Sequence, residues 1–192
     1  GDVGTNLGWN SVKKALPSIQ SAALVGKGQC GLYFRLDNKD LPFSNIKVRQ
    51  AMSLAANRQG MLKALNSPEG SPMGTLSPGW GDWALPIDQL GEGAKYFEYN
   101  PTLAKKLLAE TGYPNGFQTK LETSSSKTQQ PNAEAWLTYL KDIGIDVKFV
   151  TMDHTVFVQT AWIGKFDEFA GGSVTGGEEA GESLYGVYHS RS

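Results

Sequence analysis

The sequence is poor in the residues that build metal sites and thiol-based catalytic centres. It contains one cysteine and two histidines in 192 residues. A single cysteine excludes an internal disulfide, and Cys30 lies at the start of an apolar run, which predicts a buried and inert thiol. Neither His154 nor His189 has a neighbour that indicates pairing with a nucleophile or a metal. The sequence therefore predicts no metal site, no cofactor and no cysteine nucleophile.

The sequence also lacks an excess of either charge and a long apolar run. Its 18 basic and 19 acidic residues give a net charge of −1, so no basic surface for nucleic acid is expected. Its longest apolar run is far shorter than the ~18 residues that span a bilayer. No Ser-His-Asp order, HExxH motif or phosphate-binding loop is present.

What the sequence has in quantity is turn residues, with 23 glycines and 9 prolines. Its length suits one domain with a sizeable core. Between long loops, the apolar spacing predicts helices at 11–20 (broken at Pro17), 45–65 (two helices hinged at residues 57–58), 101–111, 130–143 and 153–163. It predicts strands at 31–37, 117–123, 145–150 and 166–170. The second half reads β-α-β-α-β, which is typical of parallel strands in an α/β fold.

Residues 99–117, YNPTLAKKLLAETGYPNGF, contain a helix with both ends marked. Asn100 is a good N-cap, and Pro101 suits the first helical position. Gly112 supplies a left-handed stop, and Pro114 prevents continuation of the helix. Local chemistry alone thus predicts one short amphipathic helix that leads into a strand.

This wording resembles a signature of the peptide/nickel/oligopeptide type of extracellular solute-binding protein, which feeds ABC importers. Residues 43–65, FSNIKVRQAMSLAANRQGMLKAL, are similar to a second segment of that family, with Asn45 and Asn57 where Asp is commoner. The sequences GYPNGF at 112–117 and YHSRS at 188–192 are similar to two more. The four matches occur in the family's order, which is more specific than any one of them.

The resemblance implies one lobe of a periplasmic-binding-protein type II-like fold, built on a mixed sheet. Family members have two lobes, so residues 1–192 are expected to form a single α/β lobe, the second one, excised from a longer protein. A naturally short protein is the alternative. The implied partners are a small polar solute, the missing first lobe and the importer's membrane subunits. The implied location is extracytoplasmic, in the periplasm or as a lipoprotein on the outer face of the cytoplasmic membrane.

One candidate ligand segment is the glycine-rich stretch 171–181, GGSVTGGEEAG. It follows the carboxyl end of a predicted strand, where α/β folds bind ligands, and it offers Ser173, Thr175 and Glu178 as polar groups. A solvated flexible loop is the alternative. In peptide-binding members this region resembles G-W-x-x-D-Y, with an Asp that pairs with the ligand's α-amino group. Here Gly176 falls at the Asp position, which puts peptide binding in doubt and leaves room for a sugar-like or other polar ligand.

The second candidate is SPGWGDWAL at 77–85, where Trp80 and Trp83 flank Asp82. Indoles beside a carboxylate suit stacking on a ligand, with the carboxylate as acceptor. Alternatively, both indoles fill the core beneath a long loop. We expect a site that combines this segment with the glycine-rich stretch and Tyr185.

The sequence leaves two other classes of function open. One is a glycan-processing enzyme domain that uses Asp82 and Glu178, and the other is an interaction module that uses the tryptophan segment. The adjacent carboxylates Asp167 and Glu168 are not expected to converge on one bond, because neighbours on a strand point to opposite faces. The absence of catalytic spacing favours a binding protein that is not an enzyme.

Overall fold

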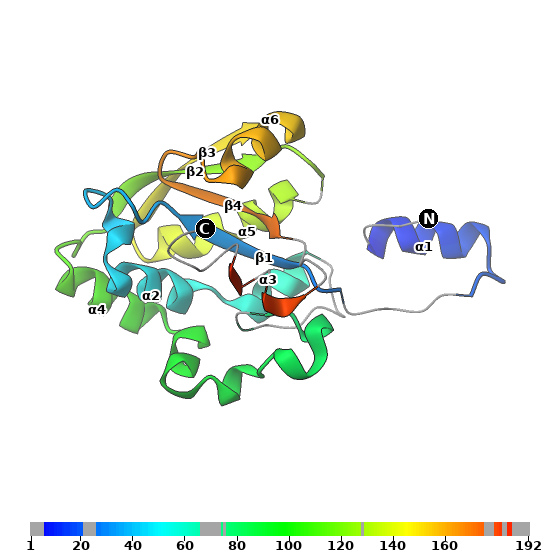
Figure 1. The fold of residues 1–192 in the computed structure, drawn as a ribbon, viewed down its shortest axis with the longest axis horizontal. Helices are drawn as coiled ribbons and strands as arrows, with labels where there is room; N and C mark the ends of the chain where they lie inside the picture. Colours follow the sequence, from blue (N-terminus) through cyan, green and yellow to red (C-terminus); the bar gives the residue numbers. More distant parts are fainter. Residues whose placement is uncertain are drawn as a thin grey trace.

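The fold is built on a four-stranded mixed sheet with helices on both faces (Figure 1). The computed structural model describes residues 6–20, 26–65, 74, 76–127, 129–174, 179–181 and 184–185. In these residues the strand order is β1-β4-β2-β3. The strands are β1 Gln29–Phe34, β2 Phe117–Ser124, β3 Ile145–Met152 and β4 Phe169–Val174.

Three strands are parallel, as the β-α-β-α-β pattern predicts. β2 pairs in parallel with both β3 and β4, so β3 and β4 run in the same direction one strand apart. Helix α5 (Gln129–Asp142) connects β2 to β3, and α6 (His154–Gln159) lies between β3 and β4. β1 is antiparallel to β4 and makes the sheet mixed. The predicted fold class is confirmed.

The larger core covers the face of the sheet that α5 shares with α2 (Ile46–Ala55) and α4 (Pro101–Glu110). Phe43 is fully buried there, and its ring centroid lies 5.0 Å from that of Phe34 and 5.2 Å from that of Phe169. Aromatic contacts at such distances add to the free energy gained by burial of apolar area. This face therefore holds most of the buried apolar residues.

A smaller core covers the opposite face, beneath α6 and the short 3-10 helix Ala161–Ile163. Phe157 and Phe166 pack here against Ala170 of β4, with Tyr33 and Met152 at the margin. Neighbouring residues of β1 and of β4 thus serve different cores, as the pleat requires: Leu32 and Phe169 belong to the larger core, and Tyr33 and Ala170 to the smaller one.

The helix starts follow the predicted caps. The side chains of Asn45 and Asn100 accept hydrogen bonds from the amides of Lys47 and Leu103, at 3.0 Å in both cases. Asn57 caps α3 (Arg58–Ala64), which confirms the hinge predicted at residues 57–58. Asparagine in place of the family's commoner Asp therefore keeps the capping interaction.

The N-terminal helix lies earlier in the chain than predicted. α1 is Asn6–Ala15, whereas the apolar spacing predicted 11–20. It ends two residues before Pro17, because proline disfavours helical backbone in the residue that precedes it. In Figure 1, α1 lies to the right of the sheet and apart from it.

Between α3 and α4, the described residues 76–100 contain no α-helix or strand and form three short 3-10 elements. They are η2 (Pro78–Trp83), η3 (Ile87–Gln89) and η4 (Gly91–Phe97). The Arg58 guanidinium holds this segment to α2: it donates to the carbonyl of Phe97 at 3.0 Å and to the hydroxyl of Ser53 at 2.7 Å. It also lies 5.0 Å from the centre of the Phe97 ring. Burial lowers the pKa of Arg58 to about 10, so the group stays charged at neutral pH.

The prediction that β4 ends at residue 170 and a loop begins at 171 is wrong. The strand starts at Phe169, includes Gly171, Gly172 and Ser173, and pairs on both sides. Its glycines leave room for the cores: a Cβ on Gly171 would lie 3.2 Å from Ala133 Cβ, and one on Gly172 would lie 3.3 Å from the Phe157 ring. Glycines that predict a loop here serve close packing on a central strand.

The prediction of a buried Cys30 is also wrong, because its side chain is exposed. Among the described residues, β1 has a neighbour on one side only, β4, so Cys30 lies on an edge strand. Its sulfur lies 3.4 Å from the side-chain nitrogen of Asn132, which donates to it.

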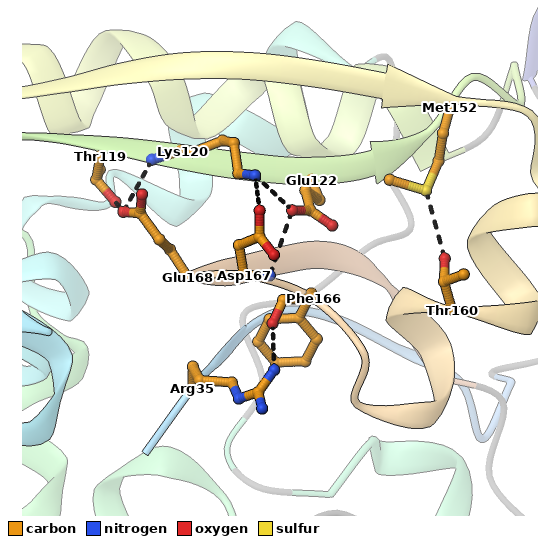
Figure 2. A network of polar contacts seen from close by, with 9 residues as sticks. All are labelled: Arg35, Thr119, Lys120, Glu122, Met152, Thr160, Phe166, Asp167 and Glu168. Carbon is orange, nitrogen blue, oxygen red and sulfur yellow. Dashed lines mark hydrogen bonds and ion pairs between the residues drawn. The ribbon is translucent and has the colours of Figure 1, made fainter. Parts of the chain in front are cut away.

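A polar network ties the amino-terminal ends of β2 and β4 to the end of β1 (Figure 2). The Lys120 ammonium pairs with Asp167 and, at 3.0 Å, with the buried carboxylate of Glu122. Glu168 instead accepts from the Thr119 hydroxyl at 2.6 Å. The carboxylates of residues 167 and 168 therefore have separate partners. Both residues precede β4 and do not lie in the strand that was expected at 166–170. The network links β2 to the residues that precede β4, and these contacts support the register of the two strands.

Candidate functional site

The candidate site lies at one edge of the sheet. The strand pairing places the carboxyl ends of β2, β3 and β4 at this edge, together with the start of β1. Parallel α/β sheets bind ligands at this edge because loops there leave backbone groups and helix starts accessible. In Figure 1 the tip of β4 and the start of β1 meet on the side that faces α1.

The tryptophan segment reaches this edge through Trp80. The Ser77 hydroxyl donates to the carbonyl of Gly26, just before β1, at 2.6 Å. The Lys27 ammonium lies 4.3 Å from the centre of the Trp80 ring. Trp80 packs with Leu76 and Ala180, so the tryptophan segment and the end of the glycine-rich stretch meet in one apolar group. We call this group the Trp80 cluster.

The structure separates the two tryptophans that the sequence treats alike. Trp80 is 7% exposed and belongs to a small core, whereas Trp83 is 73% exposed. Between them Gly81 has a positive φ of 60°, which interrupts the helical backbone, and Asp82 is exposed. Trp80 therefore supports the local fold, and Trp83 with Asp82 presents an indole and a carboxylate to solvent.

The other predicted site residues differ in what the structure shows of them. Ser173 lies within β4, opposite Cys30, and its side chain is outside the described residues. Thr175 and Glu178 lie outside the described residues altogether. Tyr185 is described and 52% exposed. The structure thus brings the Trp80 cluster to the carboxyl edge and leaves the contact between Trp83 and the glycine-rich stretch as a prediction.

The structure adds polar groups at the carboxyl ends of β2 and β3 that the sequence did not single out as a site. Ser124 ends β2, and its hydroxyl lies 3.1 Å from the Nδ1 atom of His154, which starts α6. The Ser126 hydroxyl accepts from the amide of Gln129 at the start of α5. The side-chain oxygen of Gln129 is buried and has no hydrogen-bond partner among the described residues. The serine run 124–126 directly after a predicted strand was the available signal.

The described residues contain no group of three or more metal-ligating side chains, and no helix among them is long and apolar enough to cross a membrane. What the ends of β2 and β3 offer chemically is hydroxyl groups and the imidazole of His154, while the tryptophan segment offers an exposed indole and a carboxylate. These groups bind by stacking and hydrogen bonding.

Comparison with known proteins defines the class. Residues 6–192 match the family described as "Bacterial extracellular solute-binding proteins, family 5 Middle". The chain therefore belongs to the family 5 extracellular solute-binding proteins, as the sequence motifs predict.

The similar curated proteins are much longer than this chain. The glutathione-binding protein GsiB of Pectobacterium atrosepticum is 34% identical over 124 residues, which cover 63% of this chain and 22% of that protein. GsiB of Escherichia coli K12 is 31% identical over 122 residues, with the same two shares of 63% and 22%. The match thus spans about a fifth of the length of these relatives.

Solved structures show the same fold. AgaA from A. tumefaciens R10, in complex with agropinic acid, superimposes with a TM-score of 0.67 and 32% identity over 84% of this chain and 32% of its own. CtaP from Listeria monocytogenes gives a TM-score of 0.78 at 18% identity, over 96% of this chain and 37% of its own. DppA from Helicobacter pylori, solved with the peptide STSA, gives 0.74 at 24%, over 95% and 34%. The family and these relatives are named as binding proteins.

Proposed function

We propose that residues 1–192 form one α/β lobe of a two-lobed, extracytoplasmic solute-binding protein that delivers a small polar solute to an ABC importer. The observation that carries this proposal is the family match over 6–192. In the intact protein, the solute would lie between the carboxyl edge of this lobe and the other lobe, and a hinge would close the two. The lobe would bind and not convert its solute.

The ligand class that we propose is a peptide or a similar solute with several polar groups. Two relatives above 30% identity support it by their names, since GsiB is called glutathione-binding and AgaA was solved with agropinic acid. The carboxyl edge suits such a solute: Trp83 gives an apolar surface, and Asp82 is an acceptor for a donor group. Ser173, Thr175, Glu178 and Tyr185 complete the proposed site.

The enzyme alternative gains no support from the described residues. Asp82 is exposed, and Glu178, its proposed catalytic partner, lies outside those residues. The other adjacent carboxylates, at 167 and 168, are bound in the strand-register network. We therefore propose no catalytic residue. We propose that the protein resides in the periplasm or is anchored as a lipoprotein outside the cytoplasmic membrane.

Substitution of the two tryptophans tests the proposed site. In the full-length protein, Trp83→Ala should weaken glutathione binding, because truncation of an indole anchor costs on the order of 1–3 kcal/mol. The free energy of unfolding should change by less than about 0.5 kcal/mol, because Trp83 is exposed. Calorimetric titration and urea unfolding measure the two quantities.

Trp80→Ala is the matched control. It should lower the free energy of unfolding by about 3 kcal/mol, because it removes a buried indole from the Trp80 cluster. Unchanged affinity in Trp83→Ala would remove Trp83 from the site. A thermal-shift screen with glutathione, short peptides and sugar acids tests the function itself, since a bound solute raises the melting temperature. The proposal is wrong if none of these solutes does so.

A further inference from the structure

Residues between Gly74 and Glu98 line an open hollow that the proposed function does not use. Its volume is ≈ 580 Å³, which falls in the range of ~300–1,000 Å³ of small-molecule sites. Apolar side chains form most of its wall, among them Leu76, Ala84, Leu85, Ile87 and Phe97. Leu76 belongs to the Trp80 cluster and Ala84 packs against it, so the hollow adjoins that cluster.

The charged groups in the lining of the hollow have one sign. Asp88 and Glu98 contribute two carboxylates, and no lysine or arginine is among the described lining residues. The lysine of the same segment, Lys95, is held 3.0 Å from Glu92 in an ion pair and does not line the hollow. Glu92 does not line it either. The hollow therefore combines an apolar wall with two exposed carboxylates, while the Arg58 guanidinium lies behind the wall, against the Phe97 ring.

One wall of the hollow is held in place from behind. The Arg58 guanidinium, itself part-buried, donates to the Phe97 carbonyl and lies against the Phe97 ring. The Ser53 hydroxyl donates to the carbonyl of Tyr96 at 2.7 Å, which adds a second attachment. A wall that is already ordered loses little conformational entropy when a ligand binds.

We propose that this hollow binds an organic cation, namely a primary ammonium group carried on an apolar body. The apolar body packs against Leu85, Ile87 and Phe97, and the ammonium lies at the carboxylates of Asp88 and Glu98. This site is additional to the solute site at the carboxyl edge, and it does not depend on the proposed function. Free amines and the amino termini of peptides with an apolar first residue share this chemistry.

An NMR titration of the chain with 2-phenylethylamine tests the proposal. The amide signals of residues 84–98 should shift with millimolar affinity. The neutral 2-phenylethanol and the anionic 3-phenylpropanoate have similar apolar bodies and should bind at least about threefold more weakly, since exposed charge pairs contribute modestly. The proposal is wrong if the alcohol binds as well as the amine, or if the shifts occur only outside residues 84–98.

Charge removal supplies the matched variants. Asp88→Asn with Glu98→Gln should weaken binding of 2-phenylethylamine about 3- to 10-fold. Glu92→Gln removes one carboxylate that belongs to the same segment but does not line the hollow, so it should leave affinity unchanged. Equal losses in both variants would indicate a general field effect and reject the site.

A filling variant tests the cavity independently of charge. Ala94 lines the hollow, so Ala94→Phe should abolish binding while circular dichroism shows an intact fold. If this variant does not fold, the charge variants decide. The dipeptide Phe-Gly and its N-acetyl form separate the two ligand sources. Binding of Phe-Gly alone of these two, with the same dependence on Asp88 and Glu98, identifies peptide amino termini; if neither binds while 2-phenylethylamine does, the ligand is a free amine.

Discussion

At the residue scale, two glycines with similar backbones have very different surroundings. Gly112 and Gly116 both have positive φ, at 91° and 76°. A Cβ on Gly112 would meet no atom within 4 Å, whereas a Cβ on Gly116 would lie 1.8 Å from the carbonyl oxygen of Gly144. Gly112 ends α4, but Gly116 lets the chain before β2 pass close to the chain before β3.

This difference predicts unequal costs for the same substitution. Gly112→Ala should lower the free energy of unfolding by about 1–2 kcal/mol, the cost of left-handed backbone for a residue with a Cβ. Gly116→Ala should cost at least about 3 kcal/mol, because the backbone must also move to relieve the clash. Urea unfolding of the two variants measures both values, and equal costs would contradict the proposed close approach.

Single residues also show where sequence reasoning stops. Gly112 was predicted as a helix stop from neighbours within a few positions. The role of Gly116 depends on Gly144, which is distant in sequence, so no local pattern indicates it. Trp80 and Trp83 share one local context, and only the fold decides that the first packs on Ala180. Cys30 was misjudged because edge position in a sheet is a property of strand order.

At the element scale, elements that begin at a local signal were predicted better than those that depend on non-local contacts. The caps of α2, α3, α4 and α6 are local interactions of two to three residues, and the sequence displays them directly. The predicted bounds of β4 were wrong because its pairing with β1 and β2 is non-local. Its glycines also allow close contacts with Ala133 and Phe157, which no local pattern indicates. The polar groups at the ends of β2 and β3 were missed for the same reason: strand alignment brings them together.

The cap of α6 gives a prediction about pH. Asp153 accepts hydrogen bonds from the amides of Thr155 and Val156, and these bonds lower the pKa of its carboxyl. Because the pKa is lower in the folded state, the stabilisation is present above the unfolded pKa of about 3.9 and is lost as pH falls through the folded value. Asp153→Asn keeps an acceptor for the cap but does not titrate.

The free energy of unfolding of both forms should therefore be compared between pH 2 and 6 at constant salt. The wild type minus Asp153→Asn difference should stay constant above about pH 5 and decrease below about pH 4. A difference that remains constant down to pH 2 would show that the charge of Asp153 does not contribute to the cap.

At the scale of the whole molecule, the fold could be predicted while most of the site could not. The spacing of apolar residues predicts the β-α-β-α-β order, and that order predicted correctly that three strands are parallel. A ligand site at a sheet edge depends instead on loop conformations and, as proposed above, on the surface of a second lobe. The matched region covers only about a fifth of the curated relatives, so most of each relative lies beyond it.

A solute site at one open edge of a sheet predicts weak binding by the 192-residue chain alone. Small-molecule sites commonly bury ~70–90% of a ligand's surface, which one edge of a sheet does not achieve. We therefore expect the 192-residue chain to bind glutathione at least about tenfold more weakly than the full-length protein, since roughly half of the desolvated contact is missing. Calorimetric titration of both proteins under one buffer condition measures the ratio.

Thermal unfolding of the chain serves as the control that it is folded. Equal affinities would show that this lobe holds the solute by itself, and the proposed closure of two lobes around the ligand would then be wrong.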